Sequence, residues 1–175
     1  MSKELDSRVK TPCIGVCSTG IGDSVCRGCK RFAHEVIHWN AYSEAEKRII
    51  DRRLESFLAQ IVDSKLRIID RQRLAWHLEA QHIRYDRDKS PLIWAYELLR
   101  AGASQLHDLA DYGLELDAHY RHMDLRSLKN AIDTEFFILS EAHYQRYFSP
   151  VSPVNNASDR SQTTGVGQDT EVEGV

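Results

Sequence analysis

The sequence predicts a mainly α-helical protein, in which a small cysteine-rich metal-binding module precedes a bundle-like helical region and a disordered C-terminal tail. All four cysteines of the 175-residue chain fall within residues 13–29. Apolar residues recur at helical spacing from residue 32 to residue 147, and the last residues lack this pattern. We therefore predict three parts, at residues 11–57, 58–148 and 149–175.

The four cysteines follow the pattern C-x3-C-x8-C-x2-C, and they are Cys13, Cys17, Cys26 and Cys29. Two short pairs joined by a glycine-bearing loop can fold so that four thiolates converge, which suits a tetrahedral Zn²⁺ ion or an iron–sulfur cluster. The alternatives are four unrelated thiols or two disulfides, but we see no apolar signal segment that would direct the chain to the oxidising compartment that disulfides need. We predict one metal centre with these four ligands, and the spacing leaves the choice between Zn²⁺ and an Fe-S cluster open.

The motifs around these cysteines resemble those of a known bacterial family. They are Pro12-Cys13-Ile14-Gly15-Val16-Cys17, Cys26-Arg27-Gly28-Cys29-Lys30-Arg31, Glu35, Trp39 and Ser43-x-x-Glu46-Lys47. Over roughly residues 11–55 the chain is similar to the domain of unknown function 1289, although Phe32 replaces a small hydroxyl residue expected there. Members are commonly labelled predicted Fe-S proteins, a label that rests on the cysteines. The resemblance implies that the four cysteines are ligands, and it implies no reaction.

A first helix is predicted directly after the cysteines. Its apolar residues at helical spacing are Phe32, Val36, Ile37 and Trp39. We expect Lys30 and Arg31 to begin this helix beside the cysteine site, where positive charge favours thiolate over thiol. The helix should end near residues 40–42.

A second helix should begin at Ser43, because Glu46 follows three residues later in the arrangement of a capping box. One side of this helix is apolar and consists of Ile50, Leu54, Phe57, Leu58, Ile61 and Val62. Residues 66–84 continue in helical register. The sequence does not decide whether residues 43–84 form one helix or two.

Ser90-Pro91 predicts the start of another helix, which Gly102 bends or ends, and the pattern resumes until a stop at Gly113. Asp124 should cap the last helix. The apolar stripe of that helix is Leu125, Leu128, Ile132, Phe136, Leu139, His143 and Tyr147. Steps of three and four residues are the spacing of a helical bundle. We predict no strands beyond short pairings in the cysteine loop, and we assign the tryptophans mostly to the core.

Other motifs give little support for catalysis. There is no Gly-rich phosphate loop, nucleophile elbow or dinucleotide fingerprint. Glu35-x-x-His38 and Glu79-x-x-His82 have the spacing of di-iron ligands in bundles, but we favour surface or capping roles for them. His34 and His38 are a further candidate metal pair, for which we favour exposed or supporting roles beside the cysteine site.

We therefore expect a small cytoplasmic metal-binding protein with no catalytic constellation and no membrane span. The centre would have a structural role, and the helical region would bind an unidentified macromolecule, preferably a protein. One alternative is an Fe-S protein for electron transfer or redox sensing. Another is a nucleic-acid-binding accessory protein, because residues 1–73 hold 14 Lys and Arg against 10 Asp and Glu. The basic residues for that role would be Arg27, Lys30, Arg31, Lys47, Arg48, Arg52 and Arg53.

Overall fold

The fold is taken from a computed structural model that describes residues 8–148. Its regular elements are α1 (Ala33–Ile37), α2 (Glu44–Asp63), β1 (Leu66–Ile68), α3 (Arg71–Ala80), α4 (Pro91–Gly102), β2 (Leu114–Leu116) and α5 (Leu125–Phe148). The prediction of a mainly helical protein with a cysteine cluster near its N-terminus is confirmed. The predicted disordered tail, residues 149–175, lies outside the described residues.

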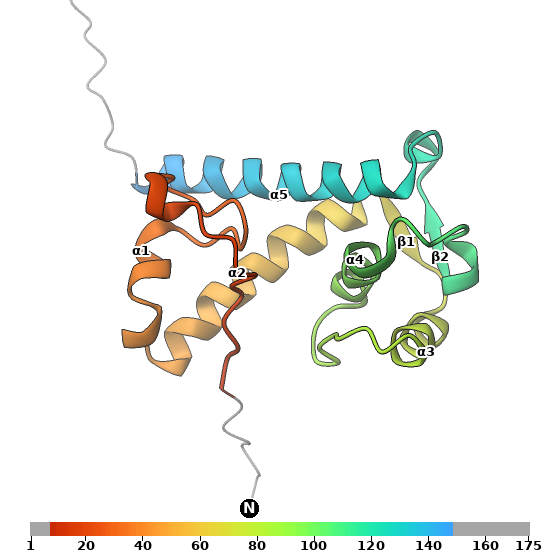
Figure 1. The fold of residues 1–175 in the computed structure, drawn as a ribbon, viewed down its shortest axis with the longest axis horizontal. Helices are drawn as coiled ribbons and strands as arrows, with labels where there is room; N and C mark the ends of the chain where they lie inside the picture. The colour runs from red at the N-terminus through yellow and green to blue at the C-terminus, as the bar shows by residue number, and fades with distance from the viewer. Residues whose placement is uncertain (1–7, 149–175) are drawn as a thin grey trace, which may run out of the picture.

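Helix α5 runs along the length of the molecule, and α2 crosses beneath it (Figure 1). The cysteine-bearing segment and α1 lie near the C-terminal end of α5, whereas the small β1–β2 sheet lies near its N-terminal end. Helix α2 packs against both α4 and α5. The predicted boundary between residues 57 and 58 falls inside α2, so this helix belongs to both predicted parts of the chain.

Three predicted helix starts, at Ser43, Ser90 and Asp124, are confirmed by their capping contacts. The Ser43 hydroxyl accepts a hydrogen bond from the Glu46 N–H, and the Glu46 carboxylate accepts one from the Ser43 N–H at 2.8 Å. Ser90 caps α4, in which Pro91 occupies the first position. Asp124 accepts a backbone hydrogen bond at the start of α5. These contacts satisfy N–H groups that have no partner within the helix, typically stabilising it by about 1 kcal/mol each.

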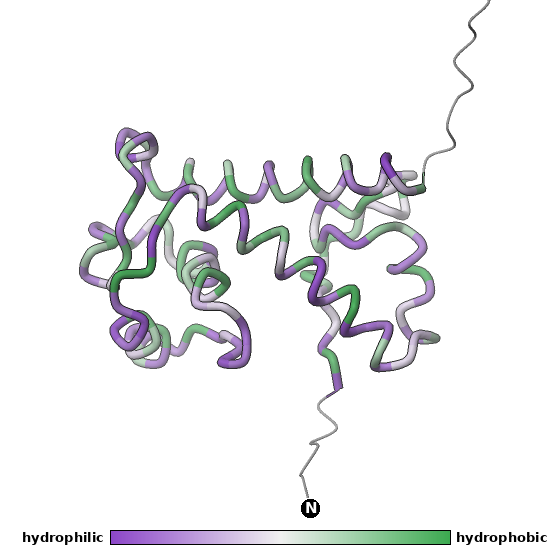
Figure 2. The backbone as a smooth tube through the Cα atoms, turned by 180° about the vertical axis from the view of Figure 1, so that it is seen from behind, coloured by the Kyte–Doolittle hydropathy of each residue, from purple (hydrophilic) through white to green (hydrophobic). Residues whose placement is uncertain are grey.

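The core lies where α2, α4 and α5 meet. Leu98 and Leu99 of α4 and Leu128 and Ile132 of α5 are completely buried. Apolar and polar residues alternate along α5, as expected for a helix with one buried face (Figure 2). The predicted stripe is correct as far as Phe136, but Tyr147 at its end is 61 % exposed. No helix in the described part of the chain is long and apolar enough to cross a bilayer.

The prediction of helix over residues 66–84 was wrong at residues 66–70 and 81–84, as was the prediction that strands are limited to the cysteine loop. β1 and β2 pair antiparallel, with Leu66 opposite Leu116 and Ile68 opposite Leu114. Leu66 and Leu114 are buried against the helical core, which stabilises a pairing of only three residues per strand. Residues 43–84 therefore contain two helices separated by a strand.

Two further expectations need correction. Trp76 is 64 % exposed and does not belong to the core. The pattern before Gly113 forms only a single 3-10 turn, Ala110–Tyr112, instead of a continued helix. Gly113 does end that turn, with a φ of 73°, and a Cβ at this position would lie 2.5 Å from the Asp70 carbonyl oxygen. Glycine is required here by both the backbone conformation and the close approach of residue 70.

Candidate metal centre

Cys26 and Cys29 lie in a tight turn at the tip of a short hairpin. Val25 pairs with Phe32 across this hairpin. Inside it, the Cys26 N–H donates to the Arg31 carbonyl at 2.9 Å, and the Lys30 N–H donates to the Cys26 carbonyl at 2.8 Å. Lys30 completes the turn with a φ of 60°, a conformation that few residues other than glycine adopt. This pairing confirms the predicted short strand contact in the cysteine loop.

The turn stabilises a thiolate at Cys26. Burial raises the pKa of this thiol, but backbone N–H groups of Cys29, Ser18 and Gly28 and the Cys29 thiol donate hydrogen bonds to its sulfur and lower it. The net effect is a pKa of about 7, below the usual 9.0 for a cysteine. Because metal ions bind the thiolate form, this environment favours a ligand role for Cys26.

Cys29 lies beside a buried arginine. Burial raises the pKa of the Cys29 thiol, and the Arg31 side chain partly opposes this, because its Nε donates to the Cys29 Sγ at 3.3 Å. The Arg31 guanidinium also lies 4.7 Å from the centre of the Trp39 ring. The predicted proximity of Arg31 to the cysteines is therefore correct, although α1 begins later, at Ala33.

The segment that holds the other two cysteines lies directly against this turn. A Cβ at residue 28 would lie 2.2 Å from the Val16 carbonyl oxygen and 3.2 Å from the Ile14 side chain, so only glycine permits the contact. The Cys26 thiol donates to the same Val16 carbonyl at 3.7 Å. Ile14 and Val16 therefore lie against the turn, and each of them directly adjoins one of the two remaining cysteines.

Cys13 and Cys17 themselves are exposed, in contrast to the two buried cysteines of the turn. The Cys17 Sγ lies 3.1 Å from the Thr19 hydroxyl. Across residues 8–148, no three His, Cys, Asp or Glu side chains are gathered closely enough to hold a metal ion. The two thiols of the Cys26–Cys29 turn are groups that can bind a metal. Cys13 and Cys17 lie at the two ends of the segment that packs against this turn.

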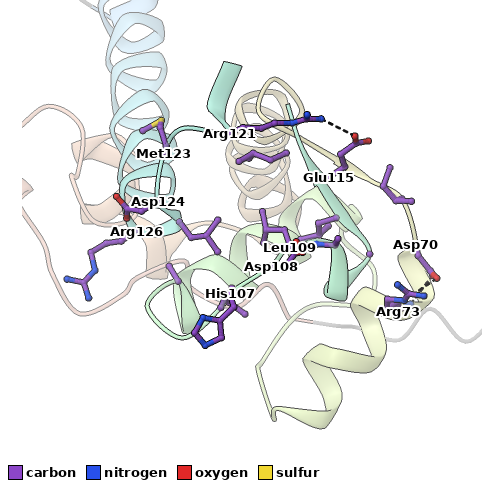
Figure 3. Close-up of a pocket in the computed structure, with 18 of the residues that line it drawn as sticks. Asp70, Arg73, His107, Asp108, Leu109, Glu115, Arg121, Met123, Asp124 and Arg126 are labelled. Carbon is purple, nitrogen blue, oxygen red and sulfur yellow. Dashed lines mark hydrogen bonds and ion pairs between the residues drawn. The ribbon is translucent and has the colours of Figure 1, made fainter. Parts of the chain in front are cut away.

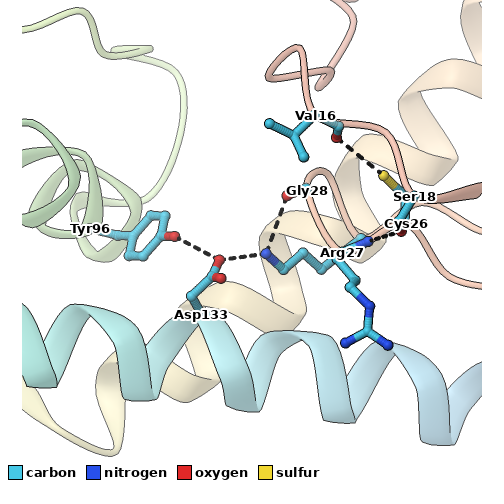
Figure 4. A network of polar contacts seen from close by, with 8 residues as sticks. Val16, Ser18, Cys26, Arg27, Gly28, Tyr96 and Asp133 are labelled. Carbon is cyan, nitrogen blue, oxygen red and sulfur yellow. Dashed lines mark hydrogen bonds and ion pairs between the residues drawn. The ribbon is translucent and has the colours of Figure 1, made fainter.

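Lys30 connects this turn to the helical region (Figure 4). Its side chain is almost fully buried, forms an ion pair with Asp133 of α5 and donates to the Gly28 carbonyl at 3.2 Å. The Tyr96 hydroxyl of α4 donates to the same Asp133 oxygen at 3.3 Å. Lys30 therefore directs its charge away from the cysteines, and it links three parts of the fold through one carboxylate.

A second buried ion pair holds α1 against α2. The Glu35 carboxylate accepts two hydrogen bonds from the Arg53 guanidinium, at 2.6 and 2.7 Å, and one from the Phe32 N–H at 2.9 Å. The guanidinium also lies 3.8 Å from the centre of the Phe32 ring. Glu35 is thus a structural residue in this fold, fully engaged by hydrogen bonds.

The remaining residues of the di-iron pattern lie in separate places. Glu79 of the second Glu-x-x-His pair forms an ion pair with Arg87. His38 is exposed, and its Nδ1 lies 2.8 Å from the His34 carbonyl. Neither histidine belongs to a cluster with the cysteines among the described residues.

Aromatic side chains pack the hairpin onto the end of α5. The Phe32 ring centre lies 5.3 Å from those of Tyr144 and Phe148 and 6.1 Å from that of His143. Phe57 of α2 approaches His143 from another side, at 5.1 Å. Burial, together with the nearby charges of Arg53 and Arg146, lowers the pKa of His143.

Several basic residues suggested for nucleic-acid contact face inward. Lys30 and Arg31 are buried, and Arg53 is paired with Glu35. Lys47 pairs with Glu44, and Arg27 pairs with Asp23 while lying over the Phe137 ring. The exposed positive surface of this region is therefore smaller than its composition suggests.

The sequence analysis missed two residues that hold Lys30, namely Asp133 and Tyr96. No local pattern pointed to them, because they are 103 and 66 positions from Lys30 in the sequence.

Residues 11–57 match the model of a family described as Protein of unknown function (DUF1289), which confirms the resemblance seen in the motifs. No curated protein and no solved structure matches the chain.

Proposed function

We propose that the DUF1289 family domain at residues 11–57 binds one metal centre through Cys13, Cys17, Cys26 and Cys29. The centre would stabilise the N-terminal module. The protein itself would bind another macromolecule and would not catalyse a reaction. The observation that supports this best is the Cys26–Cys29 turn, which holds two buried cysteines in one tight hairpin against the segment between the other two.

The position of the exposed pair supports the same proposal. Cys17 directly follows Val16, whose carbonyl contacts Cys26, and Cys13 directly precedes Ile14, which lies against Gly28. A small rearrangement of one short segment would therefore complete a four-sulfur site. Metal binding and local folding are commonly coupled in this way, because the ion supplies the energy that orders its own ligands.

The donor set suits two kinds of centre. Four thiolates bind Zn²⁺ in closed structural sites, and four thiolates also hold iron–sulfur clusters. Zinc would supply only stability. A cluster would also permit exchange of an electron, which is the alternative function of electron transfer or redox sensing.

Metal analysis of protein purified without oxygen tests the proposal. We expect about one zinc ion, or the iron and sulfide of one cluster, per chain, and only a cluster gives brown protein. Each of the four Cys→Ser variants should lose most of this metal, because a closed site has no spare ligand. Ile21→Ser is the matched control, since Ile21 lies in the same loop and is 84 % exposed. Full metal content in any one Cys→Ser variant would remove that cysteine from the site.

Exposed apolar side chains next to the cysteines favour a protein as the partner. Ile14, Val16 and Ile21 are 54 %, 65 % and 84 % exposed. Large apolar side chains beside one another at a surface often mark protein contacts. The nucleic-acid alternative predicts instead a complex whose affinity falls steeply with salt, which a mobility-shift assay at two salt concentrations would reveal.

A further inference from the structure

A cavity of about 1080 Å³ opens at the N-terminal end of α5 (Figure 3). The cysteine-bearing segment lies near the other end of that helix (Figure 1). Its wall is formed by the loop after α4, by β2 and by the residues that lead into α5. The apolar floor includes Leu106, Leu109 and Leu114, which are almost fully buried. Ile69 extends this apolar surface to the edge of the cavity, where it is 63 % exposed.

Three arginines around this floor have weak partners or none. The Arg73 Nε lies 3.8 Å from Asp70, and an Arg121 nitrogen lies 3.5 Å from Glu115. Arg126 makes no ion pair with any residue in the described part of the chain. Figure 3 shows Arg126 at one end of the cavity and Arg73 at the other. Their guanidinium groups are therefore available to a ligand.

Three of the four carboxylates of the cavity wall accept backbone hydrogen bonds; Asp70 accepts one from the Arg73 N–H at 2.9 Å, and only Glu115 is limited to its 3.5 Å contact with Arg121. Asp108 accepts a hydrogen bond from the Ala110 N–H at 2.8 Å. Asp124 accepts hydrogen bonds from the Ser127 N–H at 3.0 Å and from its hydroxyl at 2.6 Å. These acids hold turns and a helix start in place, and their negative charge is stabilised within the protein. The polar groups left to recognise a ligand are therefore mostly cationic donors.

We infer that this cavity binds an amphipathic carboxylate, such as a medium-chain fatty acid. The hydrocarbon chain would lie along the apolar lining, in which Ile69 is the most exposed of the residues named above, and the carboxylate would bind Arg121 or Arg126. Guanidinium and carboxylate groups match in geometry and can form two parallel hydrogen bonds. A cavity of this volume, with an apolar floor and a few charged groups at its edge, is typical of small-molecule sites.

The binding test uses the full-length, metal-loaded protein and decanoate below its micelle concentration, followed by calorimetry. We expect saturable binding of one decanoate per chain. Decanol and decylamine have the same chain with a neutral or a cationic head, and each should bind at least about tenfold more weakly, because a charge-assisted hydrogen bond is lost. Absence of saturable decanoate binding, or equal binding of decanol, would overturn the inference.

Variants locate the site. Replacing Arg121 and Arg126 together by Gln should weaken decanoate binding by about tenfold or more. Ile69→Ser should weaken decanoate more than the shorter hexanoate, because it removes apolar surface at the edge of the cavity. Arg52→Gln on α2 is the control, because Arg52 is exposed and lies outside the cavity lining. All these side chains are exposed, so circular dichroism should stay unchanged. Wild-type affinity in the double variant would assign the binding to another place.

Discussion

At the scale of single residues, the cysteine site depends on Gly28 as much as on its sulfurs. A glycine hydrogen faces the Val16 carbonyl where any other residue would place a carbon 2.2 Å away. This contact keeps the segment with Cys13 and Cys17 against the turn with Cys26 and Cys29. The arrangement explains why a glycine inside the C-x2-C motif matters, independently of any need for a special backbone angle.

Gly28→Ala should therefore separate the two pairs of cysteines. We expect the segment 14–16 to move away from the turn, metal content to fall well below that of the wild type, and the module to lose about 1–3 kcal/mol of stability, as in other overpacked sites. Gly20→Ala is the control, because a methyl group there would meet no atom within 4 Å. Metal analysis and thermal unfolding of both variants would check this. Equal metal content in the two would show that the packing of segment 14–16 is unnecessary for binding.

At the scale of elements, α5 receives contacts from most of the chain. Its N-terminal half packs on the helical core, Glu135 binds the buried Lys65, and its last turns contact the hairpin through His143 and Tyr144. The hydrogen bond between Lys65 and Glu135 measures 2.6 Å and fixes the start of β1 beneath the helix. One helix thus supports both the candidate metal module and the small sheet.

Local signals predicted the helix starts, because a cap and its N–H partner lie within three residues. Ser43, Ser90 and Asp124 were identified in this way. The strands were missed because Leu66 and Ile69 have helical spacing, whereas their actual structure depends on a partner about 50 positions away. The cysteine cluster was likewise evident from spacing alone. The Lys30–Asp133 pair was not, because no local pattern links residues so distant in sequence.

His143 makes the contact between α5 and the module sensitive to pH. Its pKa in the folded protein lies below the usual 6.5, chiefly because of burial. The unfolded chain therefore binds more protons in the interval between the two pKa values, and stability falls as the pH drops through that interval. His143→Phe keeps an aromatic ring and should reduce the loss of stability between about pH 7.5 and about pH 5.5.

Urea unfolding of the wild type and of His143→Phe at both pH values would measure this difference. His122→Gln is the control, because this side chain is exposed and no ion pair of it is seen among the described residues. That variant should keep the pH dependence of the wild type. An unchanged pH dependence in His143→Phe would mean that another group causes the acid sensitivity.

At the scale of the whole molecule, the candidate metal module has little core of its own. Before α2 begins, Trp39 joins the main apolar cluster, whereas Val25 and Phe32 are buried outside that cluster, at the hairpin. The helical region is different, because α2, α4 and α5 bury one another's leucines and isoleucines, and α2 is the only one of these helices that begins within residues 11–57. We therefore expect the folding of the candidate metal module to depend on the metal more than the folding of the helical region does.

Removal of the metal by a chelator should raise amide hydrogen exchange mainly in residues 11–42. The helical core should keep its protection, and most of the helical circular dichroism should remain, because small modules without a ligand bury too little surface to stay folded. Exchange measured by mass spectrometry on peptides would resolve the two regions. Equal loss of protection from residue 11 to residue 148 would show one cooperative unit and contradict the division at residue 57.

The same experiment on Asp133→Asn tests how the two regions communicate. The substituted residue lies in α5, but the change acts on the cysteine turn, because it leaves the buried Lys30 cation without its carboxylate. We expect a loss of about 1–3 kcal/mol, less than for a fully buried pair, because the Asp133 side chain is 39 % exposed. The increased exchange should appear at residues 26–31, across the contact, more than in α5 itself. Glu141→Gln, an exposed acid on the same helix, should leave residues 26–31 unaffected. If both variants behave alike, the module is held by its aromatic contacts with Tyr144 and Phe148, and the Lys30 pair contributes little.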